Sequence, residues 1–543
     1  MKRLITLIAI ASASLPLFAG NVCGRVTSCG KPLAGVQVSD GNTIVTTDAT
    51  GRYSFDSDKT SCCVFITTPS GYVAQSTDGI RPGFWQYLVL PAEQDEIHDF
   101  ALVPENQDTY TVFFPTDVHL VNDPRRQDIM RFKSIVFPHV CKRTELAKAN
   151  GPVYSFNLGD FTHDIYWYEY NMSESDGLRL IQDLGWPTAI YSVTGNHDHD
   201  GGITGENVDF RSAWRYRNVW GPDRYSVNIG RDHWIFLDNL VYINEPGKGK
   251  KAPGINGDRS YKHALTDAQL DWLEKDLAGI SKDTRVYICC HAPILRTIKN
   301  SGTLLPVKQT EKLDAMAAAF ENGITIFSGH IHRWDICDRS EFPNLHQVSL
   351  PATSGTMWET PIDWTLTSSD GSDAGIMEAE ITSGSAPRLH FECYTGGEKL
   401  YRVYDMNEVG KAYKASAEAK KQLEMFKGSR LYYGSSKYRN YVYVNFWGRR
   451  PGDRIQLFEN GKELPCETLP NEDPTCNFAY DLQVLSGTTQ HHTPKGKSSC
   501  ESMYEFKTHG AKTPLLLRIT DKDGKVRAEE TIIRPVVFNP SGK

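Results

Sequence analysis

The middle of the chain contains five short apolar runs, and each of them ends in a cluster of Asp, Asn and His residues. The runs cover residues 110–114, 153–156, 189–193, 285–290 and 324–327. They alternate with stretches of helical spacing, which is typical of an α/β domain. In open α/β sheets the loops that follow the carboxyl ends of the strands form the ligand site. We therefore expect the five clusters to converge on one edge of one sheet.

The five clusters offer oxygen and nitrogen ligands and no cysteine. They read Asp117-Val118-His119, Gly159-Asp160-Phe161-Thr162-His163-Asp164, Gly195-Asn196-His197-Asp198, His291-Ala292-Pro293 and Gly329-His330-Ile331-His332. Such ligands suit divalent or trivalent ions, namely Mn, Fe, Zn or Mg, rather than a closed structural zinc site. They are too many for one ion, which takes about four to six ligands. The sequence therefore predicts two ions that share the carboxylate of an aspartate in the second cluster.

The series D-x-H, G-D-x-x, G-N-H-D, H and G-H-x-H resembles the calcineurin-like metallophosphoesterase superfamily. The resemblance runs from Asp117 to His332, with all five motifs in the family's order. It implies an α/β fold with a metallophosphoesterase β-sandwich core flanked by helices. It also implies a phosphoric ester hydrolase in which a hydroxide activated by two metal ions attacks phosphorus in line.

The resemblance implies a role for each residue of the motifs. It implies seven metal ligands: Asp117, His119 and His332 for the first ion, Asp160 as the bridge, and Asn196, His291 and His330 for the second. His197 would not be a ligand. It would stabilise the transferring phosphoryl group and protonate the leaving oxygen, a role that suits an imidazole. Asp198 would accept a hydrogen bond from His197 and fix its orientation.

One position departs from a known branch of this superfamily. Purple acid phosphatases carry a tyrosine three residues after the bridging aspartate, where it ligates ferric iron, and this chain has His163 there. The tyrosinate-bound subclass is therefore not expected. His163 and Asp164 either line the substrate pocket or form a local turn with a capped helix start.

Two further residues are candidate substrate contacts. Arg296 follows His291 closely, and its guanidinium either meets a phosphate oxygen or lies on the surface. Trp358 lies in the turn-rich segment 351–359 and either contacts the substrate or packs in the core.

The first 20 residues predict a signal peptide. Lys2 and Arg3 precede an apolar run at positions 4–13, and small residues follow it. The alternative is an uncleaved anchor, but the run is short for a membrane span. No later segment approaches 18 uncharged apolar residues. We therefore expect an exported protein, periplasmic, cell-surface or extracellular, with no membrane span after the signal peptide is removed.

The remaining chain divides by pattern into three domains. Residues 21–107 alternate in short runs with turns and predict a small antiparallel β-sandwich, which resembles transthyretin-like and carboxypeptidase-regulatory-like modules. Residues 108–395 form the catalytic domain, and residues 396–543 return to a β-rich pattern. Within the catalytic domain, a capping box at residues 266–269 and the segment 310–321 predict helices, while the Ser-, Gly- and Asp-rich residues 363–386 suggest an internal loop. The adjacent pairs Cys62–Cys63 and Cys289–Cys290 are interpreted as buried thiols.

Composition narrows the class of substrate. The chain carries 59 basic and 66 acidic residues, a net charge of −7, which disfavours polymeric nucleic acid as a partner. A small, glycan-linked or lipid-linked phosphoester remains possible. We expect a phosphodiesterase acting on a glycan, lipid or nucleotide phosphate. The alternatives are a phosphomonoesterase and a catalytically silent cell-surface binding protein, and the oligomeric state stays open.

Overall fold

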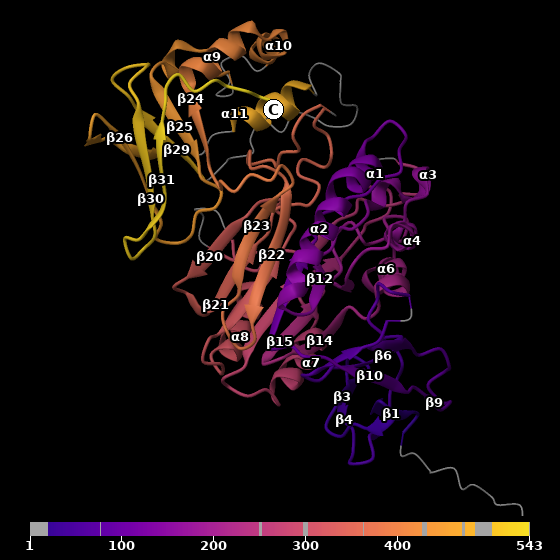
Figure 1. Ribbon diagram of the computed structural model, residues 1–543. Helices are drawn as coiled ribbons and strands as arrows, with labels where there is room; N and C mark the ends of the chain where they lie inside the picture. The colour runs from indigo at the N-terminus through magenta and orange to yellow at the C-terminus, as the bar shows by residue number, and fades with distance from the viewer. Residues whose placement is uncertain are drawn as a thin grey trace, which may run out of the picture.

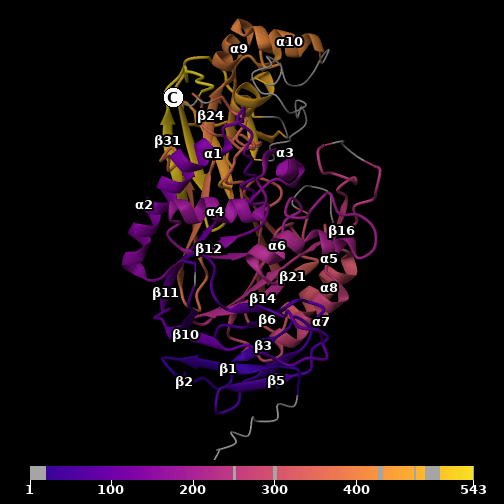
Figure 2. The ribbon, with the colours of Figure 1, turned by 90° about the vertical axis from the view of Figure 1, so that its right-hand side faces the viewer.

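The computed structural model describes residues 20–76, 78–248, 252–296, 302–361, 363–425, 432–469, 473–483 and 502–541. The predicted signal peptide lies outside these ranges, apart from its last residue. Among the described helices, none combines the length and the apolar character that crossing a bilayer requires. Figures 1 and 2 show the amino-terminal β-strands at one end of the molecule and the carboxyl-terminal β-strands at the other, with the α/β region between them.

The amino-terminal region contains two small β-sheets. The first comprises β1 (Val22–Ser28), β2 (Lys31–Pro32), β5 (Arg52–Phe55), β7 (Tyr72–Ala74), β9 (Glu96–Ile97) and β10 (Phe100–Pro104). The second comprises β3 (Gln37–Ser39), β4 (Ile44–Thr46), β6 (Cys63–Ile66) and β8 (Trp85–Tyr87). The prediction of a purely antiparallel sandwich is wrong in one respect, because β1 pairs in parallel with β9 and β10. These later strands return to β1 through long connections, which local alternation does not reveal.

Two larger sheets form the middle of the molecule. The first has the order β13-β12-β11-β22-β23 and comprises β11 (Thr109–Phe114), β12 (Val153–Asn157), β13 (Ala189–Ser192), β22 (Gly375–Thr382) and β23 (Arg388–Cys393). The second has the order β14-β15-β18-β19-β21-β20 and comprises β14 (Arg224–Ile229), β15 (Asp232–Leu237), β18 (Arg285–Cys290), β19 (Ile324–Ser328), β20 (Asp335–Arg339) and β21 (Phe342–Ser349). All five predicted runs are strands. The expectation of a single sheet is wrong, because three runs lie in the first sheet and two in the second.

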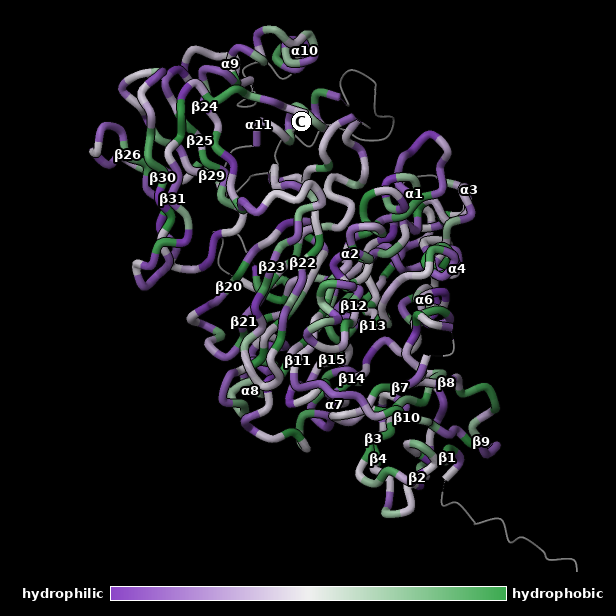
Figure 3. Tube along the Cα trace, in the orientation of Figure 1, coloured by the Kyte–Doolittle hydropathy of each residue, from purple (hydrophilic) through white to green (hydrophobic). Residues whose placement is uncertain are grey.

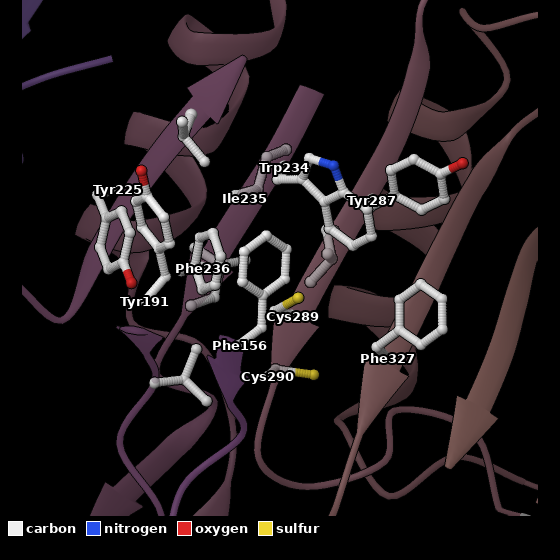
Figure 4. Close-up of a cluster of buried hydrophobic side chains, with 14 of the residues drawn as sticks. Phe156, Tyr191, Tyr225, Trp234, Ile235, Phe236, Tyr287, Cys289, Cys290 and Phe327 are labelled. Carbon is white, nitrogen blue, oxygen red and sulfur yellow. The ribbon is translucent and has the colours of Figure 1, made fainter. Parts of the chain in front are cut away.

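The two sheets face each other across an aromatic core. Figure 4 shows Phe156 from the first sheet among Trp234, Phe236 and Phe327 from the second. The ring of Phe156 lies 4.9 Å from that of Trp234 and 5.0 Å from that of Phe236. Figure 3 shows the hydrophobic residues running along these strands. Because helices cover the outer faces of the sheets, their strands are buried on both sides and read as continuous apolar runs.

Helices cover both outer faces. The first sheet is covered by α2 (Phe137–Ala147) and α4 (Glu174–Leu184), and the second by α7 (Asp267–Leu277) and α8 (Val307–Ala317). The capping box is confirmed, since the Thr266 hydroxyl accepts from the Gln269 amide and the Gln269 side chain returns to Thr266. The predicted helix over 310–321 begins and ends earlier, at Val307 and Ala317. Pro306 starts it, because its fixed φ suits a helix entry.

Two smaller expectations also change. The predicted loop over residues 363–386 contains β22, which pairs with β11 along six residues. Most of the Ser, Gly and Asp residues of this segment lie before the strand begins. The composition of the whole segment therefore predicted a loop where its second half forms a strand. Cys63, Cys289 and Cys290 are buried as expected, whereas Cys62 is partly exposed and has a φ of 64°.

The carboxyl-terminal region is β-rich, as expected. One sheet comprises β24 (Arg402–Asp405), β25 (Tyr441–Asn445), β29 (Met503–Lys507) and β28 (Cys466–Thr468). The other comprises β27 (Lys462–Glu463), β26 (Arg454–Glu459), β30 (Leu515–Thr520) and β31 (Val526–Ile532). Asn460 and Gly461 join β26 to β27, and both have positive φ, which a two-residue hairpin turn of this kind requires. Helices α9 (Met406–Ala415) and α10 (Ala417–Met425) lie beside these sheets.

Candidate metal centre

The five clusters meet although their strands belong to two sheets. In each sheet the strands that precede them are mutually parallel, so their carboxyl ends open at the same end of the sandwich. All seven predicted ligand residues lie together there. Figure 1 shows the carboxyl-terminal β-strands beyond the same end of the sandwich.

One group of ligand atoms comes from Asp117, His119 and His332. The Nε2 atom of His332 lies 3.1 Å from Oδ1 of Asp117 and 3.1 Å from Nε2 of His119. Oδ2 of Asp160 lies 3.8 Å from the same His119 nitrogen. Four potential ligand atoms from three loops thus surround one point, as coordination of a single ion requires.

A second group lies on the other side of Asp160. Its Oδ2 atom is 3.2 Å from Nε2 of His291, which is 3.1 Å from Oδ1 of Asn196. Nδ1 of His330 lies 2.9 Å from the same Asn196 oxygen. Burial opposes a charge on His291, but the Asp160 carboxylate raises the pKa of His291 to about 9. The position beside the Asp160 carboxylate therefore favours positive charge. A metal ion would compete with a proton for Nε2 of His291.

The residues fit two ions that share one carboxylate. Oδ2 of Asp160 belongs to both groups, which is the bridging geometry that the resemblance implies. Oδ1 of Asp117 is buried, and among the described residues its polar neighbour is Nε2 of His332, which would itself be a ligand. A buried carboxylate oxygen is normally satisfied, so a cation is its natural partner. The identity of the ions stays a prediction.

The backbone is strained at this centre. Five of the seven predicted ligands have positive φ: Asp117 (51°), His119 (49°), Asp160 (56°), His330 (68°) and His332 (56°). A left-handed conformation costs a non-glycine residue about 1 kcal/mol or more, and such residues concentrate at functional sites. Here it turns each side chain back from the strand end towards the centre.

Hydrogen bonds fix the outer atoms of the ligands. Oδ2 of Asp117 accepts from the Thr116 hydroxyl at 2.7 Å and from the His330 amide at 2.9 Å. Oδ1 of Asp160 accepts from the His197 amide at 2.7 Å. Nδ1 of His291 lies 2.7 Å from the carbonyl oxygen of Leu158, to which it donates when its Nε2 atom faces the centre as a ligand. These partners leave Oδ1 of Asp117 and Oδ2 of Asp160 directed at the ion positions.

Trp358 supports the first ligand loop from behind. Its side chain is 2% exposed, and its indole Nε1 donates to the carbonyl oxygen of Val118 at 2.7 Å. Ser354 likewise donates to the carbonyl oxygen of Asp117 at 2.7 Å. The substrate-contact interpretation of Trp358 is therefore wrong, and its core alternative holds, since the ring is enclosed. Arg296 is exposed and donates to the carbonyl oxygen of Thr303, and the described contacts do not join it to the ligands.

His197 has a different partner from the one expected. Its Nδ1 atom lies 2.7 Å from Oδ1 of Asp164, not near Asp198. Oδ2 of Asp198 instead accepts from the amides of Asp160 and Gly195, both at 2.8 Å. Asp198 thus ties two ligand loops together, and the prediction that it orients His197 is wrong.

His163 lies inside the centre. Its ring centroid is 4.2 Å from that of His197 and 5.3 Å from that of His119, and the residue is 7% exposed. It begins the short helix Asp164–Tyr166 without a side-chain capping bond. The local-turn alternative is correct in part, because the Tyr166 amide donates to the carbonyl oxygen of His163. The His163 side chain does not cap the helix, and its ring lies beside those of His119 and His197.

The motifs missed three residues at the centre. Arg259, Tyr261 and His263 come from the connection into strand β17 (Tyr261–His263). The rings of Tyr261 and His263 lie 6.1 and 5.4 Å from that of His330. Arg259 contacts both Asp164 and His197. No motif marks this segment, and only its partners identify it.

Family models match three consecutive parts of the chain. Three family models match: "N terminal of Calcineurin-like phosphoesterase" over residues 20–105, "Calcineurin-like phosphoesterase" over 110–334 and "C terminal of Calcineurin-like phosphoesterase" over 349–526. No curated protein matches the chain.

Solved structures show weak similarity. A dimetal phosphatase from Danio rerio is 12% identical with a TM-score of 0.32, and the match covers 52% of this chain and 98% of that one. The purple acid phosphatase PPD1 from yellow lupin is 12% identical with a TM-score of 0.36, covering 67% and 68%. Scores this low say nothing about substrate. The three family models, however, span nearly the whole described chain in the expected order, and the chain belongs to the calcineurin-like phosphoesterase family and is a phosphoesterase hydrolase.

Proposed function

We propose that the protein is an exported phosphodiesterase that depends on two metal ions and acts on a glycan, lipid or nucleotide phosphodiester. The position of Asp160 carries the proposal, because its Oδ2 atom lies 3.8 Å from His119 and 3.2 Å from His291, one residue of each ligand group. When bound, the two ions would supply an activated water as the nucleophile and positive charge for the phosphoryl oxygens.

The protein's own residues prepare the site for this chemistry. Asp117, His119 and His332 would hold one ion, Asn196, His291 and His330 the other, and Asp160 both. The His197 side chain is 18% exposed, so it can reach a substrate, while its amide holds the outer oxygen of Asp160. In this arrangement His197 would donate a proton to the leaving oxygen.

The charges near the centre favour a diester over a monoester. Arg259 contacts His197, and Arg126 lies over the ring of Tyr166, which contacts the ring of His163. Carboxylates already neutralise both arginines. Arg126 is paired with Asp128 and Glu359, and Arg259 is paired with Asp164. A monoester carries one more negative charge than a diester at neutral pH. A site whose neighbouring guanidinium groups are already paired therefore suits the singly charged diester.

Export rests on the sequence alone. Lys2, Arg3 and the apolar run at positions 4–13 have the order of a signal peptide. An exported enzyme would meet phosphodiesters of glycans, lipids and nucleotides outside the cytoplasm.

The test uses the mature protein loaded with Mn²⁺ and two aryl substrates, para-nitrophenyl phosphate and bis-para-nitrophenyl phosphate. We expect faster turnover of the diester, and loss of turnover when a chelator removes the metal. On a phenyl diester, whose phenolate needs a proton to leave, the His197→Ala variant should lose roughly 10²- to 10⁴-fold in kcat, the usual contribution of a general acid. The matched control is His346→Ala, because His346 is exposed on β21 and pairs only with Asp338.

Two results would overturn the proposal. Faster turnover of the monoester would make the protein a phosphatase. Absence of turnover of both esters, with two metal ions bound, would favour a catalytically silent binding protein.

A further inference from the structure

Arg259 packs against the pair formed by Asp164 and His197, and its side chain is 22% exposed. Its Nε and one terminal nitrogen donate to the two carboxylate oxygens of Asp164 at 2.5 and 2.6 Å. The same terminal nitrogen lies 2.8 Å from Nδ1 of His197. The three side chains come from three separate loops and meet beside the metal ligands.

The loop that carries Arg259 is docked firmly. Arg259 has a φ of 58°, and its amide donates to Oδ1 of Asn244 at 2.6 Å. Asn244 is 1% exposed, and its Nδ2 atom donates to the carbonyl oxygens of Gly201 and Ile203. A left-handed residue held by a buried side chain is over-determined by its surroundings, which is how strained conformations persist at functional sites. Arg259 is therefore held in one place.

The buried Asp164 carboxylate requires the Arg259 guanidinium as its partner. Its carboxylate is fully buried, and an unpaired charge there would be costly. Burial alone would raise the pKa of Asp164, but the Arg259 guanidinium holds it below its usual value. Asp164 therefore stays an acceptor that can orient the imidazole of His197.

We propose that Arg259 is a positioning residue, which holds Asp164 and the His197 ring in the orientation needed for proton donation to the leaving group. The inference rests on the proposed function, in which His197 is the proton donor. Nδ1 of His197 has a partner in either tautomer, since it can donate to Asp164 or accept from Arg259. The ring is thus held without a change of rotamer, with its other nitrogen available to the substrate.

A rival role is direct binding of the phosphate by the guanidinium. The two roles predict different kinetics. A phosphate ligand contributes mainly to KM, whereas a residue that orients the proton donor contributes to kcat and only where the leaving group needs a proton.

The experiment compares metal-loaded wild-type protein with Arg259→Ala on two diesters, one with a phenolate and one with a para-nitrophenolate leaving group. We expect kcat for the phenyl diester to fall roughly 10- to 100-fold, part of the full contribution of a general acid. The para-nitrophenyl diester should lose less than about 3-fold, because its leaving group departs without a proton. KM should change little, and added guanidinium ion should restore part of the lost rate.

Two further variants sharpen the test. Arg259→Lys keeps the charge but lacks the two-pronged geometry, so it should lose an intermediate amount, and it replaces the alanine variant if that fails to fold. Arg215→Ala is the matched control, because Arg215 pairs with Asp200 outside the centre.

Three outcomes would overturn the inference. They are a raised KM with unchanged kcat, an equal loss on both diesters, and a crystal structure of Arg259→Ala in which His197 keeps its orientation. The crystal structure does not depend on turnover. If wild-type protein hydrolyses neither diester, the proposed function fails, while the orientation of His197 in the variant still decides the role of Arg259.

Discussion

The aromatic core and the metal centre occupy different parts of the same strands, and they follow opposite rules. In the core, Trp234 stacks on Tyr287 at 4.1 Å (Figure 4). Phe114 stacks on Phe327 at 4.8 Å, and all four side chains are buried. Its few polar atoms are paired, for example the Trp234 Nε1 that donates to the Tyr110 hydroxyl. Every contact there lowers the free energy of the fold.

The metal centre lies a few residues further along and is costly on its own. Phe156 is separated from Asp160 by three residues, and Phe327 from His330 by two. Five left-handed ligands and several buried carboxylates gather there. Burial and then the neighbouring Glu174 raise the pKa of Asp198 well above its usual value. The comparison indicates that packing stabilises the core, while the centre is held in place by that packing and completed by metal.

The largest expected effect is on the bridge of the centre. Asp160→Asn removes the shared carboxylate charge, and we expect kcat to fall by about 10³-fold or more, since a metal contributes several kcal/mol and each 1.4 kcal/mol is tenfold. Elemental analysis should find fewer than two ions per chain. The metal-free variant should be less stable than metal-free wild type, because the buried His291 loses the carboxylate charge with which it pairs at 3.2 Å. If Asp160→Asn keeps full activity with two ions bound, the centre does not depend on the shared carboxylate, and its contrast with the core fails.

A substitution in the core should have the opposite profile. Phe156 is fully buried between the sheets, so Phe156→Ala should lower the free energy of unfolding by about 3–5 kcal/mol. Metal content and kcat of the folded fraction should stay within about 3-fold of wild type, because the ligand loops keep their hydrogen bonds. Denaturant titration and metal analysis measure both quantities. A loss of metal at unchanged stability would show that core and centre are not separable.

The smallest expected effect tests a buried carboxylate at the opposite ends of the strands from the centre. Asp232 begins β15 and accepts from the Tyr110 hydroxyl at 2.8 Å. Burial raises the pKa of Asp232 to about 6, against about 3.9 in the unfolded chain. The folded state then holds more protons between these values, so wild-type stability should fall as pH rises from about 4 to about 6.

The variant Asp232→Asn removes this titration. Relative to wild type it should gain roughly 3 kcal/mol of stability across that window and keep the gain above it. Denaturant unfolding from pH 4 to 8 measures the difference, with Asp271→Asn on the exposed face of α7 as control. Parallel pH curves for wild type and Asp232→Asn would contradict the role of Asp232.

Much of the fold was readable from local patterns. The five apolar runs are strands because helices and the opposing sheet bury both faces, and the capping box at Thr266 formed as expected. Strand β22 was missed because it pairs with β11 from more than 260 residues away, and no local pattern encodes that partner. The prediction of one sheet instead of two failed for the same reason. An apolar run shows that a segment is a strand, but not which other strands it pairs with.

The sequence by itself determined the chemistry of the centre: seven oxygen and nitrogen ligands in five motifs, with His197 beside them. The residue types of the ligands and their order along the chain are local properties, so they can be identified without knowledge of the fold. Only the tertiary structure decided that Asp164 rather than Asp198 faces His197, and that Trp358 supports the Asp117 loop. It alone brought Arg259 to Asp164 across 95 positions, because contacts between distant loops depend on how two sheets pack.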